Sequence, residues 1–338
     1  QFRTPKTIAQ AVARFSKEAG LDAEAELNEA VPVLQSLIQA GYLVPLDAKN
    51  VSAIPPSLSR RVEIAGWTVL QLVQTMEDTE VWQVRRNPSE IAALKIGRPG
   101  HPTATRAVEH EAHVLSRLDS AVGSRLLSAG FWDSRPYLMT EWLTGTDAGK
   151  VCSEFRARND AASKQAMLIV TSAILQTYAA LHDCGVIHGD VHARNVLVDP
   201  QQSVKILDFG AARIVGRDKI AAASRAGVSF FFEPELAQAV RAGSYPPLPT
   251  ALGEQYSIGA LIYFLLTGRY YLDFIVEKNE MLRQIAEDEM VPFATRGLAA
   301  WPEAERTLRK ALQKKPVDRF SSLAEFSRAW ERVGIPQF

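Results

Sequence analysis

The spacing of the apolar positions changes twice along the chain. From about residue 7 to 44 apolar residues recur at helical intervals, which predicts two helices and then a short strand. From Ile64 the pattern becomes short β-like runs, which predicts an antiparallel sheet with one inserted helix. From about residue 163 helical spacing returns, interrupted by two short pairs of strands. This order of elements predicts an α+β protein.

The first of these regions is predicted to be a separate N-terminal module, residues 1–50. Its helix, helix, strand order resembles the end of a winged-helix module, including the peptide-binding type found in modified-peptide biosynthesis. The alternative is a helical appendage that packs on the next domain. A polar stretch with two prolines follows and is predicted to be a linker, residues 51–62.

Composition and charge narrow the class of protein. The chain is 47% hydrophobic and 22% charged, and its 38 basic residues balance 38 acidic ones. No net field therefore favours nucleic acid or a membrane surface as a partner. No apolar run approaches the roughly 20 residues of a membrane-spanning helix. Two distant cysteines, Cys152 and Cys184, indicate a reduced compartment, so we expect a cytoplasmic protein. Because residue 1 is glutamine, we expect a fragment of a longer polypeptide.

Two short motifs in the second half of the chain carry the candidate chemistry. Residues 186–199 read VIHGDVHARNVLVD, and residues 205–210 read KILDFG. Asp190 is placed to accept a proton from, or to orient, an attacking hydroxyl. Asn195, through its amide oxygen, and Asp208 are candidate ligands of Mg²⁺, which prefers such hard oxygen atoms. His188 is predicted to be a structural, buried residue.

Earlier in the chain, Lys95 lies inside the apolar strand sequence AALKIG, and Glu111 lies in the helix that follows. A strand lysine paired with a helix glutamate can hold the α- and β-phosphates of a nucleotide. A purely structural ion pair would give the same pattern.

Together these motifs closely resemble the protein-kinase-like superfamily, and the resemblance covers about residues 64–330. Further motifs support it: FEPE at Phe232–Glu235, the long helix sequence EQYSIGALIYFLLTG, and KKPVDRFSS. The resemblance implies a buried ion pair between Glu235 and Arg319. The form HGDxHxxN also resembles small-molecule kinases, but the segment ending in FEPE and the elements after it favour a protein kinase.

This resemblance implies a bilobal fold, with residues 63–143 in the smaller lobe and residues 144–338 in the larger. It also implies ATP and Mg²⁺ as cofactors, and a protein or peptide as substrate. Lys95 would orient the phosphates, with Glu111 fixing it. The nucleotide would further contact Val81, a gatekeeper at Thr140, and the backbone around Glu141 and Leu143.

The phosphate-covering loop departs from the family pattern. Gln74, Met76 and Thr79 stand where the family has three glycines, so backbone amides are less free to approach the phosphates. The acidic side chains of Glu77, Asp78 and Glu80 are expected to weaken nucleotide binding further.

The catalytic loop departs from the pattern as well. Gly189 replaces the arginine that precedes the aspartate, and His192 replaces a lysine that contacts the γ-phosphate. Arg194 either compensates for that lysine or is a solvated residue at the rim. Glu254 replaces the aspartate that holds the catalytic loop.

The main hypothesis is an ATP- and Mg²⁺-dependent protein kinase that phosphorylates Ser or Thr, with Asp190, Lys95, Glu111, Arg194 and His192 as catalytic residues. One alternative is a nucleotide-binding pseudokinase that acts as a scaffold. Another is the kinase domain of a lanthipeptide-type synthetase, in which the N-terminal module binds a leader peptide.

Overall fold

The computed structural model describes residues 55–216, 229–275 and 277–335, together with a few isolated positions before residue 55. The chain divides into two compact units, Gln1–Pro55 and Pro56–Phe338. The predicted N-terminal module at residues 1–50 lies almost wholly outside the described residues. The second unit contains the fold described below.

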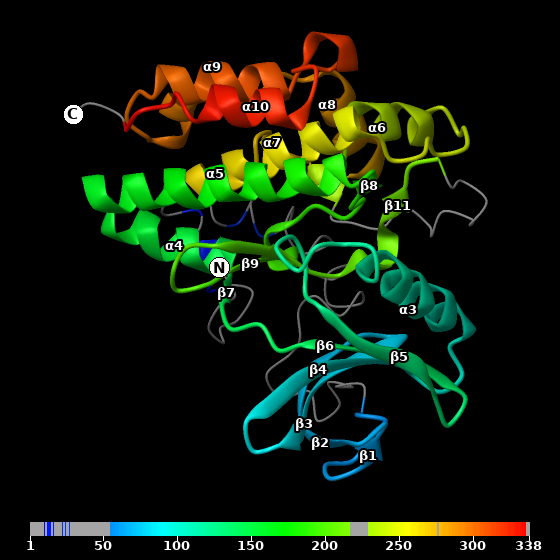
Figure 1. The fold of residues 1–338 in the computed structure, drawn as a ribbon. Helices are drawn as coiled ribbons and strands as arrows, with labels where there is room; N and C mark the ends of the chain where they lie inside the picture. Colours follow the sequence, from blue (N-terminus) through cyan, green and yellow to red (C-terminus); the bar gives the residue numbers. More distant parts are fainter. Residues whose placement is uncertain are drawn as a thin grey trace. The chain divides into compact units, whose positions relative to one another are not determined.

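The smaller lobe is a six-stranded antiparallel sheet in the order β1-β2-β3-β4-β6-β5, with helix α3 beside it (Figure 1). Along β4 the buried side chains of Leu94 and Ile96 join one hydrophobic core, and the intervening Lys95 points to the opposite face. The elements are β1 (Glu63–Ile64), β2 (Trp67–Thr75), β3 (Thr79–Asn87), β4 (Glu90–Gly97), α3 (Pro102–Leu115), β5 (Leu126–Trp132) and β6 (Arg135–Glu141).

The larger lobe is mainly helical and is built around α7 (Ala251–Thr267). This helix is apolar on all sides, and most of its residues are buried, as expected for a helix at the centre of a lobe. Thr250 caps its start by accepting a hydrogen bond from the Gly253 amide, and Gly268 ends it at a positive φ of 70°. The other helices are α4 (Ala148–Arg158), α5 (Ala161–Asp183), α6 (Pro234–Arg241), α8 (Lys278–Glu287), α9 (Pro302–Ala311) and α10 (Leu323–Trp330).

Two small sheets hold the motif loops against this helical body. One has the order β10-β9-β7 and the other pairs β11 with β8, which confirms the two short strand pairs expected from the sequence. The strands are β7 (Thr146–Asp147), β8 (Val186–Ile187), β9 (Val196–Val198), β10 (Val204–Ile206) and β11 (Arg213–Ile214). The α+β bilobal fold is therefore confirmed. In the described part of the chain, no helix has the length and apolar character needed to span a membrane.

Candidate active site

Lys95 lies at the centre of the candidate site. Its strand β4 pairs with β3 and β6, opposite Val81 on one side and Leu138 on the other. The ammonium Nζ donates to Glu111 Oε2 at 2.6 Å and to Asp208 Oδ1 at 2.8 Å. Strand β4, helix α3 and the loop after β10 therefore meet at one lysine.

The charges of Lys95 and Asp208 stabilise one another. Burial alone would lower the pKa of Lys95, but the adjacent carboxylates outweigh burial and raise it, so the lysine stays protonated. Burial raises the pKa of Glu111. Burial also acts to raise the pKa of Asp208, but the Lys95 ammonium outweighs it and the pKa lies below its usual value. Asp208 is therefore ionised at neutral pH.

The loop after β10 is shaped by the DFG residues. Asp208 has a positive φ of 62° and accepts a hydrogen bond from the Gly210 amide at 3.4 Å. The Phe209 amide lies 3.3 Å from Glu111 Oε1, and the Phe209 ring is buried against His188, with ring centroids 5.2 Å apart. Glu111 thus contacts both the lysine and the loop that carries Asp208.

Asp190 and Asn195 lie together in the catalytic loop. The Asn195 amide Nδ2 donates to the backbone oxygen of Asp190 at 3.0 Å and to its Oδ2 at 3.2 Å. The other carboxylate oxygen, Asp190 Oδ1, is buried and has no hydrogen-bond partner among the described residues. The Asp190 side chain as a whole is 16% exposed, so its carboxylate can be approached from outside the chain.

His188 bridges backbone groups from inside the larger lobe, as predicted. The residue is fully buried, its Nε2 lies 2.9 Å from the Leu207 oxygen, and its Nδ1 accepts from the Asp190 amide at 3.3 Å. These partners require the proton on Nε2. His188 therefore joins the loop of Asp190 to the strand that leads to Asp208.

Glu254, near the start of α7, also holds the catalytic loop. Its Oε1 accepts from the Gly189 amide at 2.7 Å, and its Oε2 lies 2.7 Å from His182 Nε2 at the end of α5. Gly189 has a positive φ of 77°, and a Cβ there would lie 2.7 Å from the Ala211 oxygen. The absence of a side chain at Gly189 therefore fits the close approach of the loops.

His192 and Arg194 occupy different environments. His192 Nδ1 accepts from the Arg194 amide, and its Nε2 lies 3.7 Å from Asp190 Oδ2. Burial lowers the pKa of His192, so the imidazole is neutral at pH 7. The Arg194 side chain is exposed at the rim of the loop.

The phosphate-covering turn joins β2 and β3 at residues 76–78. The sequence-based expectation for Glu80 is wrong: its side chain is fully buried on the face opposite Lys95. It forms an ion pair with Arg98, and its Oε2 accepts from Ser57 Oγ at 2.8 Å and from Trp82 Nε1 at 3.0 Å. Its negative charge is therefore neutralised on the side of the sheet away from Lys95.

The other two acidic residues of this turn differ from Glu80. Glu77 is exposed, whereas Asp78 is half-buried and its Oδ1 accepts from Thr79 Oγ1 at 3.3 Å. Only Glu77 remains as a solvated acidic side chain in the turn.

The residues expected around the adenine lie at the end of β6 and just after it. Thr140 is buried, and Val81 is half-buried opposite Lys95 on the paired strand. The Glu141 amide donates to the Arg125 oxygen at 3.0 Å, which anchors the backbone where β6 ends. Leu143 is half-buried beyond it.

The implied ion pair between Glu235 and Arg319 is present. Arg319 Nη1 and Nη2 donate to the two Glu235 carboxylate oxygens at 3.0 and 2.7 Å, and the arginine side chain is fully buried. This bidentate pair ties the start of α6 to the chain before α10.

A family model described as "Protein kinase domain" matches residues 78–330, more than half of the chain. The chain belongs to the protein kinase family. Among solved structures, the kinase domain of PknI from Mycobacterium tuberculosis superposes with a TM-score of 0.58 at 20% sequence identity. That comparison covers 82% of this chain and 98% of the PknI chain, and it supports the protein kinase fold.

Curated relatives include serine/threonine-protein kinases from bacteria. The kinase pkn3 of Myxococcus xanthus is 27% identical over 258 residues, which cover 72% of this chain and 45% of pkn3. PknB of Mycolicibacterium smegmatis is 27% identical over 202 residues, which cover 59% of this chain and 30% of PknB. The chain thus spans about half or less of the length of these relatives.

Some residues that shape the site were not identified from the sequence. His182 supports Glu254, while Ser57, Arg98 and Arg135 surround Glu80; Arg135 Nη2 donates to Ser57 Oγ at 2.6 Å. These residues carry no motif. The position of Glu80 could have been inferred, because side chains alternate along a strand and Val81 was already assigned to the nucleotide face. The neighbouring Glu80 should therefore point to the opposite face.

Proposed function

We propose that this protein kinase transfers the γ-phosphate of ATP, in the presence of Mg²⁺, to a serine or threonine hydroxyl of a protein or peptide. The observation that carries the proposal is the contact of Lys95 with both Glu111 and Asp208. A buried cation held by carboxylates from two other segments is positioned in advance, and phosphoryl transfer depends mainly on positioning and charge neutralisation.

The oxygen atoms present fit a magnesium ion. The Asn195 amide nitrogen is turned to Asp190, which leaves the amide oxygen available, and Asp208 uses Oδ1 for its contact with Lys95. Mg²⁺ is usually held by one or two carboxylates plus substrate phosphates, so two protein ligands are sufficient. Among the described residues, no cluster of three or more His, Cys, Asp or Glu side chains forms a separate metal site. When bound, Mg²⁺ would neutralise charge on the β- and γ-phosphates.

The residues of the chain would then have separate roles in the transfer. Lys95 binds phosphate oxygens, and Glu111 keeps the ammonium in place. The acceptor hydroxyl donates its hydrogen bond to the Asp190 carboxylate, and its oxygen forms a bond to the γ-phosphorus. The bond from that phosphorus to the β–γ bridging oxygen breaks, ADP leaves, and the hydroxyl proton passes to Asp190.

His192 and Arg194 have narrower roles in this proposal. His192 is neutral and lies beside Asp190, so it can donate a hydrogen bond to the transferred group but adds no charge. The exposed Arg194 can contact the acceptor protein at the rim. Serine and threonine are the proposed acceptors because the relatives described above are named as serine/threonine kinases.

The test is transfer of radiolabelled phosphate from ATP to a general protein acceptor, with and without Mg²⁺. Asp190→Asn should abolish transfer while ATP still raises the melting temperature, because Lys95 and Asp208 are intact. Asp183→Asn is the matched control, since Asp183 is exposed at the end of α5, and it should retain full activity. Nucleotide binding without any transfer by the unaltered protein would instead indicate a pseudokinase.

A further inference from the structure

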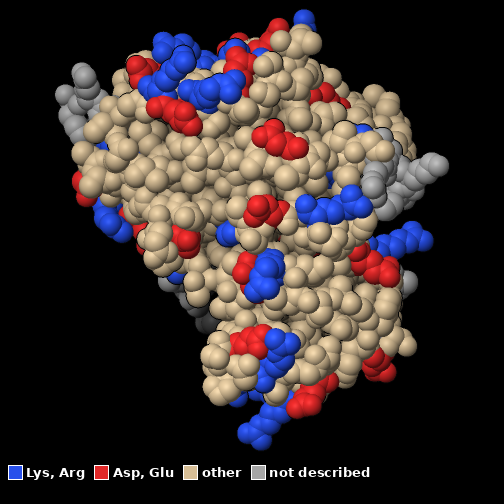
Figure 2. Space-filling model, viewed as in Figure 1, with Lys and Arg blue, Asp and Glu red and all other residues tan. Residues whose placement is uncertain are grey.

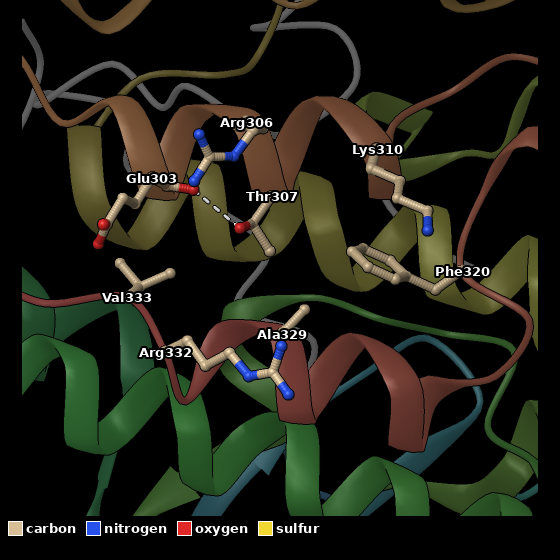
Figure 3. Close-up of a pocket in the computed structure, with 8 residues that line it drawn as sticks. All are labelled: Glu303, Arg306, Thr307, Lys310, Phe320, Ala329, Arg332 and Val333. Atoms are coloured by element: carbon tan, nitrogen blue, oxygen red, sulfur yellow. Dashed lines mark hydrogen bonds between the residues drawn. The ribbon is translucent and has the colours of Figure 1, made fainter.

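The larger lobe has a hollow of about 340 Å³ on the helices α9 and α10 (Figure 3). Its apolar lining includes Phe320, Ala329 and Val333, and the first and last of these are buried. The two helices lie at the end of the larger lobe away from the sheet (Figure 1), and they carry none of the candidate active-site residues. A separate binding function can therefore be tested independently of phosphoryl transfer.

Three exposed basic side chains line this hollow: Arg306, Lys310 and Arg332. Lys310 Nζ lies 3.6 Å from Glu325 and 4.4 Å from the centre of the Phe320 ring. Within the described residues, the side chains of Arg306 and Arg332 form no ion pair or hydrogen bond. Two guanidinium groups beside an apolar floor are thus available to a ligand.

The acidic side chains near the hollow are already engaged or lie at its margin. Among the described residues, Glu303 is the one carboxylate in the lining, and its Oε2 accepts from the Gly334 amide at 3.2 Å. Figure 2 shows Lys and Arg side chains gathered over this end of the lobe, with Asp and Glu side chains at the edges. The lining is therefore positively charged, but only over a short span, because acidic residues lie at its edges.

We propose that this hollow is a docking site for an acidic peptide segment of a partner protein. An apolar side chain of the peptide would pack on Phe320 and Val333, and neighbouring carboxylates would pair with Arg306 and Arg332. Arginine suits this role because its planar guanidinium can bind a carboxylate through two hydrogen bonds. The acidic margin disfavours a long polyanion such as nucleic acid, whose charge would extend beyond the basic side chains.

The experiment measures fluorescence anisotropy of a labelled peptide that has a leucine flanked on both sides by glutamates, using the full chain. The comparison probes are a peptide with lysines in place of the glutamates, one with phosphoserines there, and a single-stranded oligonucleotide. The protein variants are Arg306→Glu combined with Arg332→Glu, and Arg328→Glu as a matched control. Arg328 lies on α10 but outside the hollow.

We expect the glutamate peptide to bind more tightly than the other probes, and its binding to weaken as salt rises. The double variant should raise its Kd by about tenfold or more, and Arg328→Glu by less than about twofold. Melting temperatures should stay unchanged, because the two arginine side chains have no partners among the described residues. The proposal is overturned if the glutamate peptide binds no better than the lysine peptide, or if the double variant leaves its Kd unchanged. Tighter binding of the phosphoserine peptide or the oligonucleotide would also overturn it.

Discussion

The ion pair between Glu235 and Arg319 gives a prediction whose size can be worked out from the contacts. Arg319 makes five hydrogen bonds: two to Glu235 and three to the backbone oxygens of Gln313, Lys314 and Leu252. All its donors are therefore satisfied, and its side chain is out of contact with water. Glu235→Ala would remove the only carboxylate that Arg319 contacts in the described structure and leave a buried charge unpaired.

Breaking a buried pair from one side typically costs about 3–5 kcal/mol, which is a large part of the ~5–15 kcal/mol that stabilises a folded domain. We therefore expect Glu235→Ala to lower the free energy of unfolding by about 3 kcal/mol or more. Urea titration followed by tryptophan fluorescence measures this loss. The variant should also lose phosphate transfer, because Glu235 lies in the first turn of α6, at the end of the segment that carries FEPE.

A double-mutant cycle provides the control. Arg319→Met alone should also destabilise the protein, because it leaves Glu235 without its partner and three carbonyl oxygens without donors. Combined with Glu235→Ala, it should cost clearly less than the sum of the two single changes. Additive losses, or a loss below about 1 kcal/mol for Glu235→Ala, would refute the view that this pair holds the lobe together.

Three further predictions concern charge and geometry. Burial lowers the pKa of Lys314 to about 8 from an ordinary 10.5, so the unfolded chain binds more protons than the folded chain between these pH values. In urea titrations, the stability of the unaltered protein relative to Lys314→Met should therefore rise by up to about 3 kcal/mol from pH 8 to 10.5. A stability difference that does not change with pH would contradict this. In Glu254→Asp the side chain is one methylene too short to reach both partners, so the free energy of unfolding should fall by about 1.5–3 kcal/mol and kcat should fall as well. A variant that affected folding alone would leave kcat per folded molecule unchanged. His192→Lys places a permanent charge beside Asp190 and should raise kcat by about fivefold, as a contact worth roughly 1 kcal/mol allows; an unchanged or lower kcat would count against a role for His192 near the transferred phosphate.

Sequence patterns predicted the elements that carry short, ordered motifs. The alternation along AALKIG places Lys95 opposite the core residues Leu94 and Ile96, and the structure shows this arrangement. The change from β-like to helical spacing was predicted too late in the chain, because α4 (Ala148–Arg158) comes before residue 163.

The contacts between distant segments were less predictable. The pairing of Glu80 with Arg98 and Ser57 depends on which face of β3 the glutamate occupies. Counting the acidic residues near the turn therefore placed Glu80 beside the nucleotide instead of in the interior. Support of Glu254 by His182 depends on how the end of α5 meets the start of α7. Neither arrangement has a local sequence pattern, since each is fixed by packing between elements far apart in the chain.

The central claim is that Lys95, Glu111, Asp190, Asn195 and Asp208 act on the triphosphate of one bound nucleotide. Anomalous diffraction from crystals of the full chain with Mn²⁺ and a non-hydrolysable ATP analogue tests it most directly. We predict a manganese peak in contact with Asn195 and Asp208, with the analogue's phosphates beside Lys95. A nucleotide bound elsewhere, or a metal that contacts neither Asn195 nor Asp208, would contradict the account.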